Sequence, residues 1–333
     1  MKESVNQKME LFLNILLLAA GFLALIKGAD FFVDGSSALA KNFKVPGVII
    51  GLTIVAMGTS APELAVSTSA AIKGANEIAL SNVTGSNIFN LLGVLGVCAL
   101  IRPLPIEPVI MKRDFPLSIG ISLLTLGAVG LPFVLKGNIT SAAMSDNVGE
   151  VSRIFGIILL VLFVSYIVIL IRSARKSPQQ EENSELTPLW KCAVLILIGL
   201  ACIIAGGQFV VNSAKAIASA FGMSETLIGL TIVAIGTSLP ELVTSVVASR
   251  KGENGLAVGN VVGSNIFNLL FILGISGTIH PITVNLASVI DLAVLVVVSV
   301  ITMVFARTKN IGRTEGAVMV LIYAADVVFA VLR

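Results

Sequence analysis

A long internal repeat constrains this chain more than any other feature of its sequence. Residues 51–96 align without a gap on residues 229–274, at a constant offset of 178 residues, and about two-thirds of the aligned positions are identical. GLTIVAMGTSAPEL returns as GLTIVAIGTSLPEL, and SNVTGSNIFNLL returns as GNVVGSNIFNLL. The matching residues are mainly Gly, Thr, Ser, Pro, Glu and Asn, so chance similarity between apolar helices does not explain them. The repeat predicts two related halves.

Composition places both halves in a membrane. The 333-residue chain is 56% hydrophobic and 12% charged, and its mean hydropathy is +1.00, whereas soluble domains carry about 25% charged residues. A spanning helix needs about 20 mainly apolar residues, and reading for such runs gives ten. We expect the spans at 11–40, 45–73, 77–101, 115–135, 153–173, 189–219, 222–250, 255–279, 284–306 and 314–332.

The number of spans in each half determines how the halves are related in the membrane. The first five-helix repeat is predicted at 1–173 and the second at 189–333, with a polar cytoplasmic linker at 174–188. Because five is odd, the second repeat enters the membrane from the opposite side. Inverted repeats of this kind are typical of transporters with a substrate site near the middle of the bilayer. The predicted fold class is therefore an all-α polytopic membrane protein made of two inverted five-helix repeats.

Lysine and arginine residues of the short loops gather mainly on one side of this topology. The positive-inside rule makes that side cytoplasmic, so both termini are expected outside the cell and the chain in the cell membrane. The net charge of +3 is spread over these loops, which excludes nucleic acid as a partner. Membrane lipid is the expected surrounding, and no obligate protein partner is predicted.

Each copy of the repeat carries the motif Gly-Thr-Ser-x-Pro-Glu inside a predicted span, ending at Glu63 and Glu241. The spacing from Ser60 to Glu63, and from Ser238 to Glu241, also matches a helix capping box with proline in the first turn. A carboxylate near the bilayer centre costs at least about 2.5 kcal/mol, and a broken helix is tolerated there only beside protein or a watery cavity. We therefore expect helices 2 and 7 to be broken at a midplane site, with the caps presenting both carboxylates to an ion.

The second repeated motif, Gly-Ser-Asn-Ile-Phe-Asn, adds polar side chains on one helix face. Hydrogen bonding between helices would also explain it, but its duplication beside the glutamates favours an ion site. Two carboxylates neutralise one Ca²⁺, and the set can supply the six to eight oxygens that Ca²⁺ prefers. The sequence has no Cys and His cluster suited to a transition metal. The candidate ligands are Glu63, Glu241, Thr59, Thr237, Ser60, Ser238, Ser86, Ser264, Asn90 and Asn268.

Two further acidic residues, Asp30 and Asp34, lie in the first span. Their counterparts in the second half are Gln208 and Asn212, so they cannot both be symmetric ligands. We expect a packing or vestibule role for them.

Ligand chemistry predicts a secondary active antiporter that exchanges Ca²⁺ for Na⁺ by alternating access. Na⁺ also binds oxygen and could use the same carboxylates, so competition for shared ligands is, as a hypothesis, enough to couple the two ions. The alternative is a proton-driven Ca²⁺ exchanger, although the serine and threonine residues around each glutamate favour Na⁺. A channel would use rings of acidic groups around an open pore. No credible Ser/His pair or phosphate-binding loop indicates an enzyme, and no cofactor is expected.

The paired motifs resemble those of the calcium/cation antiporter superfamily, in particular its prokaryotic sodium/calcium exchanger branch, over essentially the whole chain. The resemblance implies that the second, third, seventh and eighth spans line the site, and that one Ca²⁺ leaves the cell against several Na⁺ ions in an electrogenic cycle. It also implies that the first and sixth spans slide, and it adds the carbonyl groups of Ala56 and Ala234 as Na⁺ ligands. Asn268 is aspartate in some similar exchangers, so the resemblance leaves the number of Na⁺ ions open.

Overall fold

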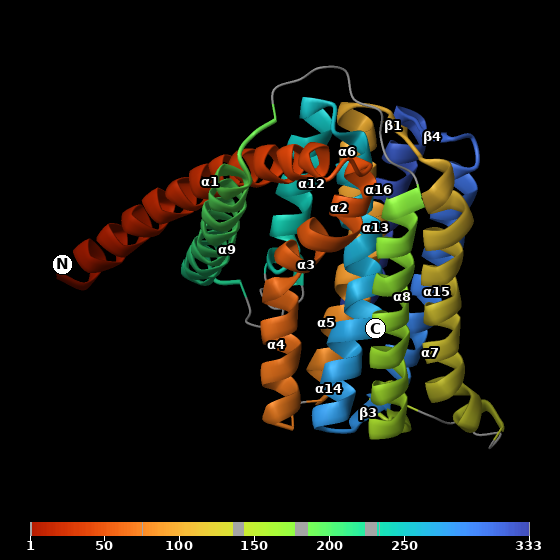
Figure 1. Ribbon diagram of the computed structural model, residues 1–333. Helices are drawn as coiled ribbons and strands as arrows, with labels where there is room; N and C mark the ends of the chain where they lie inside the picture. The colour runs from red at the N-terminus through yellow and green to blue at the C-terminus, as the bar shows by residue number, and fades with distance from the viewer. Residues whose placement is uncertain are drawn as a thin grey trace.

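The computed structural model shows a tall helical bundle with two long helices on one flank (Figure 1). It describes residues 2–74, 76–135, 143–176, 186–223, 232 and 234–332. In these ranges eight helices are long and apolar enough to cross a membrane, or nine if the bent pair Gly47–Thr59 and Ala61–Ile72 forms one span. Most of the predicted span 222–250 is described, but 224–231 and 233 are not, so the prediction of ten spans stays open.

The helices before the polar linker follow the predicted spans, but several spans are divided by π-helical segments, labelled η. The segment bounds are α1 Lys2–Asn42, α2 Gly47–Ile50, η1 Gly51–Val55, α3 Ala56–Thr59, α4 Ala61–Ile72, α5 Asn76–Phe89, η2 Asn90–Val94, α6 Leu95–Ile101, η3 Ile110–Asp114, α7 Phe115–Leu135 and α8 Arg153–Lys176. π-Helical turns are rare and occur frequently at functional sites. Here η1 and η2 lie in the two spans that carry the repeated motifs.

The helices after the linker repeat much of this pattern. Their bounds are α9 Leu189–Ala220, α11 Ala234–Gly236, α12 Leu239–Lys251, α13 Asn254–Phe267, η5 Asn268–Ile272, α14 Leu273–Ile279, α15 Leu286–Ala306 and α16 Arg313–Leu332. The segments η2 and η5 begin at Asn90 and Asn268, which are matching positions of the repeat. The sequence repeat is therefore also a repeat of local backbone structure.

Two short antiparallel ribbons, which the sequence did not predict, connect segments that lie between the helices. β1 (Leu104–Pro105) pairs with β4 (Asn310–Ile311), with Leu104 opposite Ile311. β2 (Asn147–Val151) pairs with β3 (Ile282–Asn285), with Val151 opposite Ile282. Each ribbon pairs a strand from the half of the chain before the linker with a strand from the half after it. The strands are too short to show an alternating pattern in the sequence.

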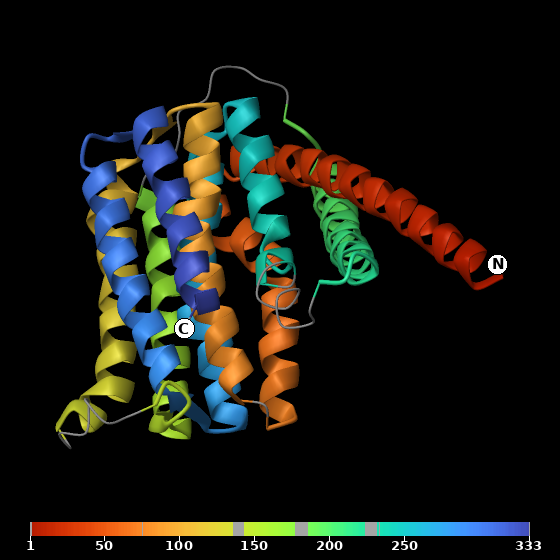
Figure 2. The same cartoon turned by 180° about the vertical axis from the view of Figure 1, so that it is seen from behind.

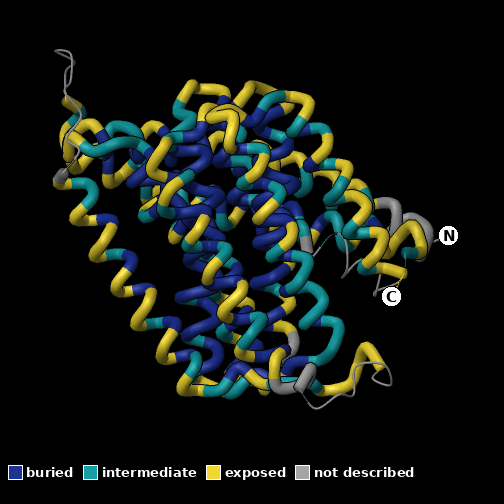
Figure 3. Tube along the Cα trace, turned by 90° about the vertical axis from the view of Figure 1, so that its right-hand side faces the viewer, coloured by how far each residue is buried: buried dark blue, intermediate teal, exposed yellow. Residues whose placement is uncertain are grey.

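The motif-bearing helices occupy the centre of the bundle, where Figure 3 shows the buried part of the trace. In the most apolar windows of Ile78–Ile101 and Asn254–Ile279, 78% and 94% of the residues are buried, compared with 11% in the first long helix. Glycine permits close packing there, because a Cβ on Gly263 would lie 2.7 Å from Leu52 Cα and 2.9 Å from Ala56 Cβ. This contact brings α13 against η1 and α3.

The two long helices, α1 and α9, cross beside the bundle and pack mainly on each other, as both views show (Figures 1 and 2). A Cβ on Gly28 would lie 2.8 Å from the Gly199 carbonyl oxygen, and one on Gly206 would lie 2.8 Å from the Gly21 carbonyl oxygen. Gly28 and Gly206 thus permit the close approach of α1 and α9. A Cβ on Gly207 would meet no atom nearer than 4.0 Å, so this glycine lies beside the tight contact.

Candidate ion-binding site

Both glutamates lie in the first turn of a helix that follows a break. α3 ends at Thr59, and α4 begins at Ala61 with a bend of 50°. Pro62 lies in the first turn of α4, where its missing N–H is not needed. In the second copy, Ser238 precedes α12, and Pro240 takes the matching place. The bend in the first copy lies where helix 2 was expected to be interrupted, and the expectation that both helices 2 and 7 are broken at a midplane site stays a prediction.

The capping box predicted from the sequence is not formed, because the backbone N–H groups of Ser60 and Ser238 bond to carbonyl oxygens and not to the glutamates. Ser60 and Ser238 occupy the N-cap positions, but neither side chain caps its own helix. Instead, the Ser60 hydroxyl donates a 2.7 Å hydrogen bond to Oε1 of Glu241. The Ser238 hydroxyl likewise donates a 2.9 Å hydrogen bond to Oε1 of Glu63. Each copy of the motif therefore supplies the serine that binds the other copy's carboxylate.

Two further serines approach the same carboxylate oxygens from neighbouring helices. The Ser86 hydroxyl lies 3.4 Å from Oε1 of Glu63, and the Ser264 hydroxyl lies 3.5 Å from Oε1 of Glu241. Both glutamates are fully buried. Hydrogen bonds to ionised groups are the stronger ones, so this arrangement stabilises charged carboxylates in a place where burial alone would disfavour them.

Several buried oxygen atoms of the site have no hydrogen-bond partner among the described residues. Buried polar atoms are ordinarily paired, so unpaired oxygens on both glutamates and on both asparagine ligand candidates fit a bound cation. No buried nitrogen of these residues is left unpaired in the same way. The unpaired atoms are Oε2 of Glu63, Oε2 of Glu241, Oδ1 of Asn90, Oδ1 of Asn268 and Oγ1 of Thr237.

A reciprocal set of amide hydrogen bonds, which we call the amide clamp, fixes the orientation of the two asparagine ligand candidates. Nδ2 of Asn90 donates to Oδ1 of Asn265 at 3.1 Å, and Nδ2 of Asn268 donates to Oδ1 of Asn87 at 3.0 Å. Asn87 and Asn265 also donate to each other's backbone carbonyl oxygen, at 3.2 and 3.1 Å. Because the amide nitrogens are held by the clamp, the oxygens of Asn90 and Asn268 are the free ends.

The remaining predicted residues lie around this group. The Thr59 hydroxyl is 3.0 Å from Oδ1 of Asn260 and 3.3 Å from the carbonyl oxygen of Ala56. That carbonyl also lies 3.5 Å from the Ser264 hydroxyl. Ala234 begins α11, directly before the motif of the second copy. Hydrogen-bond contacts thus join ten of the twelve predicted groups to other residues of the two motifs and their neighbours. Thr237 is placed only by its motif and its unpaired hydroxyl, and Ala234 only by its helix.

Sequence analysis missed four residues that support the glutamates from behind. Nδ2 of Asn82 lies 3.3 Å from the Glu63 carbonyl oxygen, and Nδ2 of Asn260 lies 3.5 Å from the Glu241 carbonyl oxygen. Each asparagine also donates a 2.9 Å hydrogen bond to a serine hydroxyl one turn after the glutamate, at Ser67 and Ser245. All four are identical between the copies at the offset of 178 residues, and that signal could have identified them.

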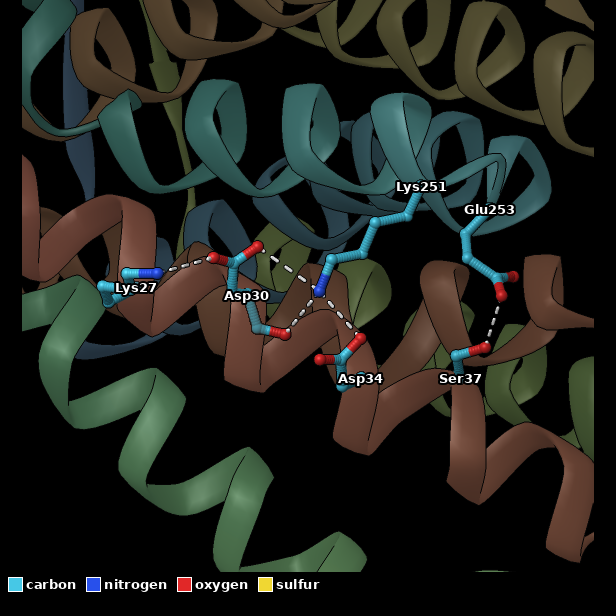
Figure 4. A network of polar contacts seen from close by, with 6 residues as sticks. All are labelled: Lys27, Asp30, Asp34, Ser37, Lys251 and Glu253. Carbon is cyan, nitrogen blue, oxygen red and sulfur yellow. Dashed lines mark hydrogen bonds and ion pairs between the residues drawn. The ribbon is translucent and has the colours of Figure 1, made fainter. Parts of the chain in front are cut away.

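The acidic residues of the first span belong to a separate polar network on the flank of the bundle (Figure 4). The Lys251 ammonium group at the end of α12 lies 2.7 Å from a carboxylate oxygen of Asp34 and 3.3 Å from one of Asp30. One turn further along α1, the Ser37 hydroxyl donates a 2.6 Å hydrogen bond to Glu253. Of the two expected roles, these contacts fit packing of α1 against α12.

Comparisons with known proteins agree in pointing to one family. The family model described as sodium/calcium exchanger protein matches residues 13–172 and 191–332. The chain is 39% identical over 316 residues to a putative antiporter, CaxA, of Alkalimonas amylolytica, covering 91% of this chain and 94% of that protein. It is 33% identical over 348 residues to the sodium/calcium exchanger MaX1 of Methanosarcina acetivorans, covering 95% and 97%. Among solved structures, the sodium-calcium exchanger NCX_Mj superposes with a TM-score of 0.80 at 31% identity, covering 97% of this chain and all of that one.

Proposed function

Because this chain belongs to the sodium/calcium exchanger family, whose members are transporters rather than enzymes, we propose that it exchanges Ca²⁺ for Na⁺ by alternating access. The observation that carries the proposal is the pair of fully buried carboxylates, Glu63 and Glu241, each bound by a serine of the other copy. Such a pair supplies two negative charges in one shared polar region. The two negative charges are balanced by one Ca²⁺, or by one Na⁺ ion at each carboxylate.

The ligand assignment starts from the unpaired oxygen atoms and is completed by the ligands that the family resemblance implies. Oε2 of Glu63 and Glu241 and the hydroxyl of Thr237, which are unpaired, would hold Ca²⁺ together with the hydroxyl of Thr59, since hard cations of this size take carboxylate and neutral oxygens together. The Na⁺ positions would be completed by Ser60, Ser238, Ser86, Ser264, Asn90, Asn268 and the carbonyl groups of Ala56 and Ala234. Asn90 and Asn268 are neutral, so the two glutamates carry all the fixed charge of these positions.

The resemblance to sodium/calcium exchangers leads us to propose that several Na⁺ ions replace one Ca²⁺ in each cycle, although the two carboxylates alone would balance either one Ca²⁺ or two Na⁺ ions. Three or more Na⁺ ions carry more charge than one Ca²⁺, so net charge would move and the exchange would be electrogenic. With Na⁺ entering down its gradient, the cycle exports Ca²⁺. In a cell membrane with both termini outside, as loop charges indicate, the polar linker 174–188 lies in the cytoplasm.

Alternating access is proposed to follow from the packing of α1 and α9. These helices contact each other far more than they contact the bundle, and their interface is built on glycine backbone. The two inverted five-helix repeats, 1–173 and 189–333, would each contribute one long helix to this pair. Sliding of the pair past the carboxylates would open the site to one side of the membrane and close it to the other.

Uptake of radioactive calcium into proteoliposomes tests the proposed coupling. Vesicles loaded with Na⁺ should take up Ca²⁺, and vesicles loaded with K⁺ should not. An acid-inside gradient without Na⁺ should fail to drive uptake, because the proposal assigns the second ion to Na⁺ rather than to protons. Uptake driven by the acid gradient alone would establish the proton-coupled alternative, and uptake indifferent to every counter-ion would refute exchange.

A further inference from the structure

An apolar groove runs along the outside of the bundle between α8 and the segment formed by α2, η1 and α3. Its volume is about 840 Å³, within the range of pockets that bind organic ligands. The floor is formed by Ile49, Ile50 and Leu170, which are buried, and the walls include Ile171 and Met57, which are 50% and 41% exposed. Apart from Thr53, the lining between floor and rim is apolar or small.

The groove faces the lipid rather than water. The neighbouring outward face of α8 carries large apolar side chains, such as Val161 and Val164, that are 60% and 62% exposed. Exposed apolar surface of this extent marks a contact with lipid or protein, and α8 is one of the helices long and apolar enough to cross the membrane. The groove is therefore a depression in the lipid-facing surface.

Two basic side chains stand at one end of this depression. Lys44 and Arg175 line the groove and are exposed. Neither forms an ion pair with a described residue, since the ion pairs found in the described ranges involve Lys27, Arg113 and Lys251. The described lining contains no carboxylate. The rim thus carries two positive charges that the protein itself does not neutralise.

The length of the groove matches one leaflet of a bilayer. Ile167 and Arg175, the first and last lining residues on α8, are eight residues apart, which corresponds to about 12 Å along a helix. One leaflet contributes about half of the roughly 30 Å hydrocarbon core. A chain that starts at Arg175 therefore reaches most of the way to the bilayer midplane beside Ile167.

We propose that this groove binds an anionic phospholipid, with its phosphate between Lys44 and Arg175 and one acyl chain on the apolar floor. The charge at the rim selects lipids with a net negative headgroup, and each basic side chain near a membrane surface contributes roughly a five-fold preference. A free phosphate ion would bind the two basic side chains of the rim but would make no apolar contact with Ile49, Ile50 and Leu170. The site is distinct from the ion-binding residues and does not depend on which cations are exchanged.

The bound lipid would contact a helix that contributes to the ion site. Met57 and Thr53 line the groove. Met57 belongs to α3, which also contains Ala56 and Thr59, and Thr53 belongs to η1, which directly precedes α3. The lipid therefore packs against the outer side of the backbone whose inner side carries the proposed ligands. Its presence would help to hold α3 in place at the break before α4.

Quenching of tryptophan fluorescence by brominated lipids tests the proposal on the full chain. The chain has one tryptophan, Trp190, so the Trp190→Phe variant has no tryptophan fluorescence. Adding Ile171→Trp to this variant places a single fluorescent reporter in the groove. In phosphatidylcholine vesicles, phosphatidylglycerol brominated on its acyl chains should quench this reporter at a concentration at least roughly five-fold lower than brominated phosphatidylcholine does. Adding Lys44→Gln and Arg175→Gln should abolish the difference.

Val164→Trp in the same background is the matched control, because it puts the reporter on the exposed face of α8 outside the groove. Both brominated lipids should quench that reporter equally. Met57→Trp offers a second reporter on the opposite wall, should Ile171→Trp fail to fold. Equal quenching by the two lipids at either groove position would overturn the proposal, as would a preference that survives removal of both basic side chains.

Discussion

Replacing Gly28 with alanine adds one methyl group to the interface between α1 and α9, and the distances around Gly28 give the size of the resulting clash. The added Cβ would lie 2.7 Å from Cys202 Cβ and 2.8 Å from the carbonyl oxygen of Gly199. Carbon atoms in favourable contact are about 3.5–4.0 Å apart, so the helices must separate by roughly 1 Å. Overpacking of this kind costs about 1–3 kcal/mol, while the gain in helix propensity is about 1 kcal/mol at most. We expect Gly28→Ala to be destabilised and to exchange ions more slowly.

Gly207→Ala is the matched control, because its Cβ would meet no atom nearer than 4.0 Å. That variant should gain helix propensity without a clash and melt at or above the wild-type temperature. A thiol-reactive fluorogenic dye can follow the melting, since Cys98 and Cys192 are buried in the folded protein. Equal melting temperatures and equal exchange rates for the two variants would refute the packing argument.

Three other perturbations have definite expected results. Ser60→Ala removes a hydrogen bond to the buried Glu241 carboxylate, worth about 1.5–3 kcal/mol, so the ion-free protein should melt at a lower temperature. Asn265→Ala removes two amide-clamp bonds and leaves buried partners unpaired, which should cost about 2–5 kcal/mol in a thermal melt. Burial, and secondarily Asp114, raises the pKa of Glu107 in the loop after α6. Folding therefore favours protonated Glu107, stability should fall as pH rises past the ordinary carboxyl range, and Glu107→Gln should flatten that fall.

Much of the site could be predicted because the sequence repeats it. The offset of 178 residues paired Glu63 with Glu241 and Asn90 with Asn268 before any contact was known, and charge in an apolar span indicated a function. The breaks were predicted from Gly and Pro at positions where a continuous helix cannot form. Span boundaries followed from hydropathy alone, and α8 begins at the predicted residue 153.

The partners of these residues could not be predicted in the same way. The Ser-x-x-Glu spacing describes a local cap, but the hydroxyl of Ser60 binds Glu241, which is 181 positions away. The hydroxyl of Ser60 donates its hydrogen to a carboxylate, which is a strong, charge-assisted hydrogen bond, whereas in a cap its oxygen would accept a hydrogen bond from a backbone N–H. Likewise, helical spacing placed the polar side chains of the second motif on one face, but only the packing of α5 against η5 shows that Asn87 holds Asn268.

Calcium binding to the purified protein, measured by titration calorimetry without Na⁺, tests the central claim most directly. If Glu63 and Glu241 share one site, Glu63→Gln and Glu241→Gln should each weaken Ca²⁺ binding by roughly a hundred-fold or more, because ligand charge changes Ca²⁺ affinity over several decades. The two losses should be similar, as the reciprocal serine contacts require. Wild-type affinity in either variant would contradict a site built from both copies of the repeat.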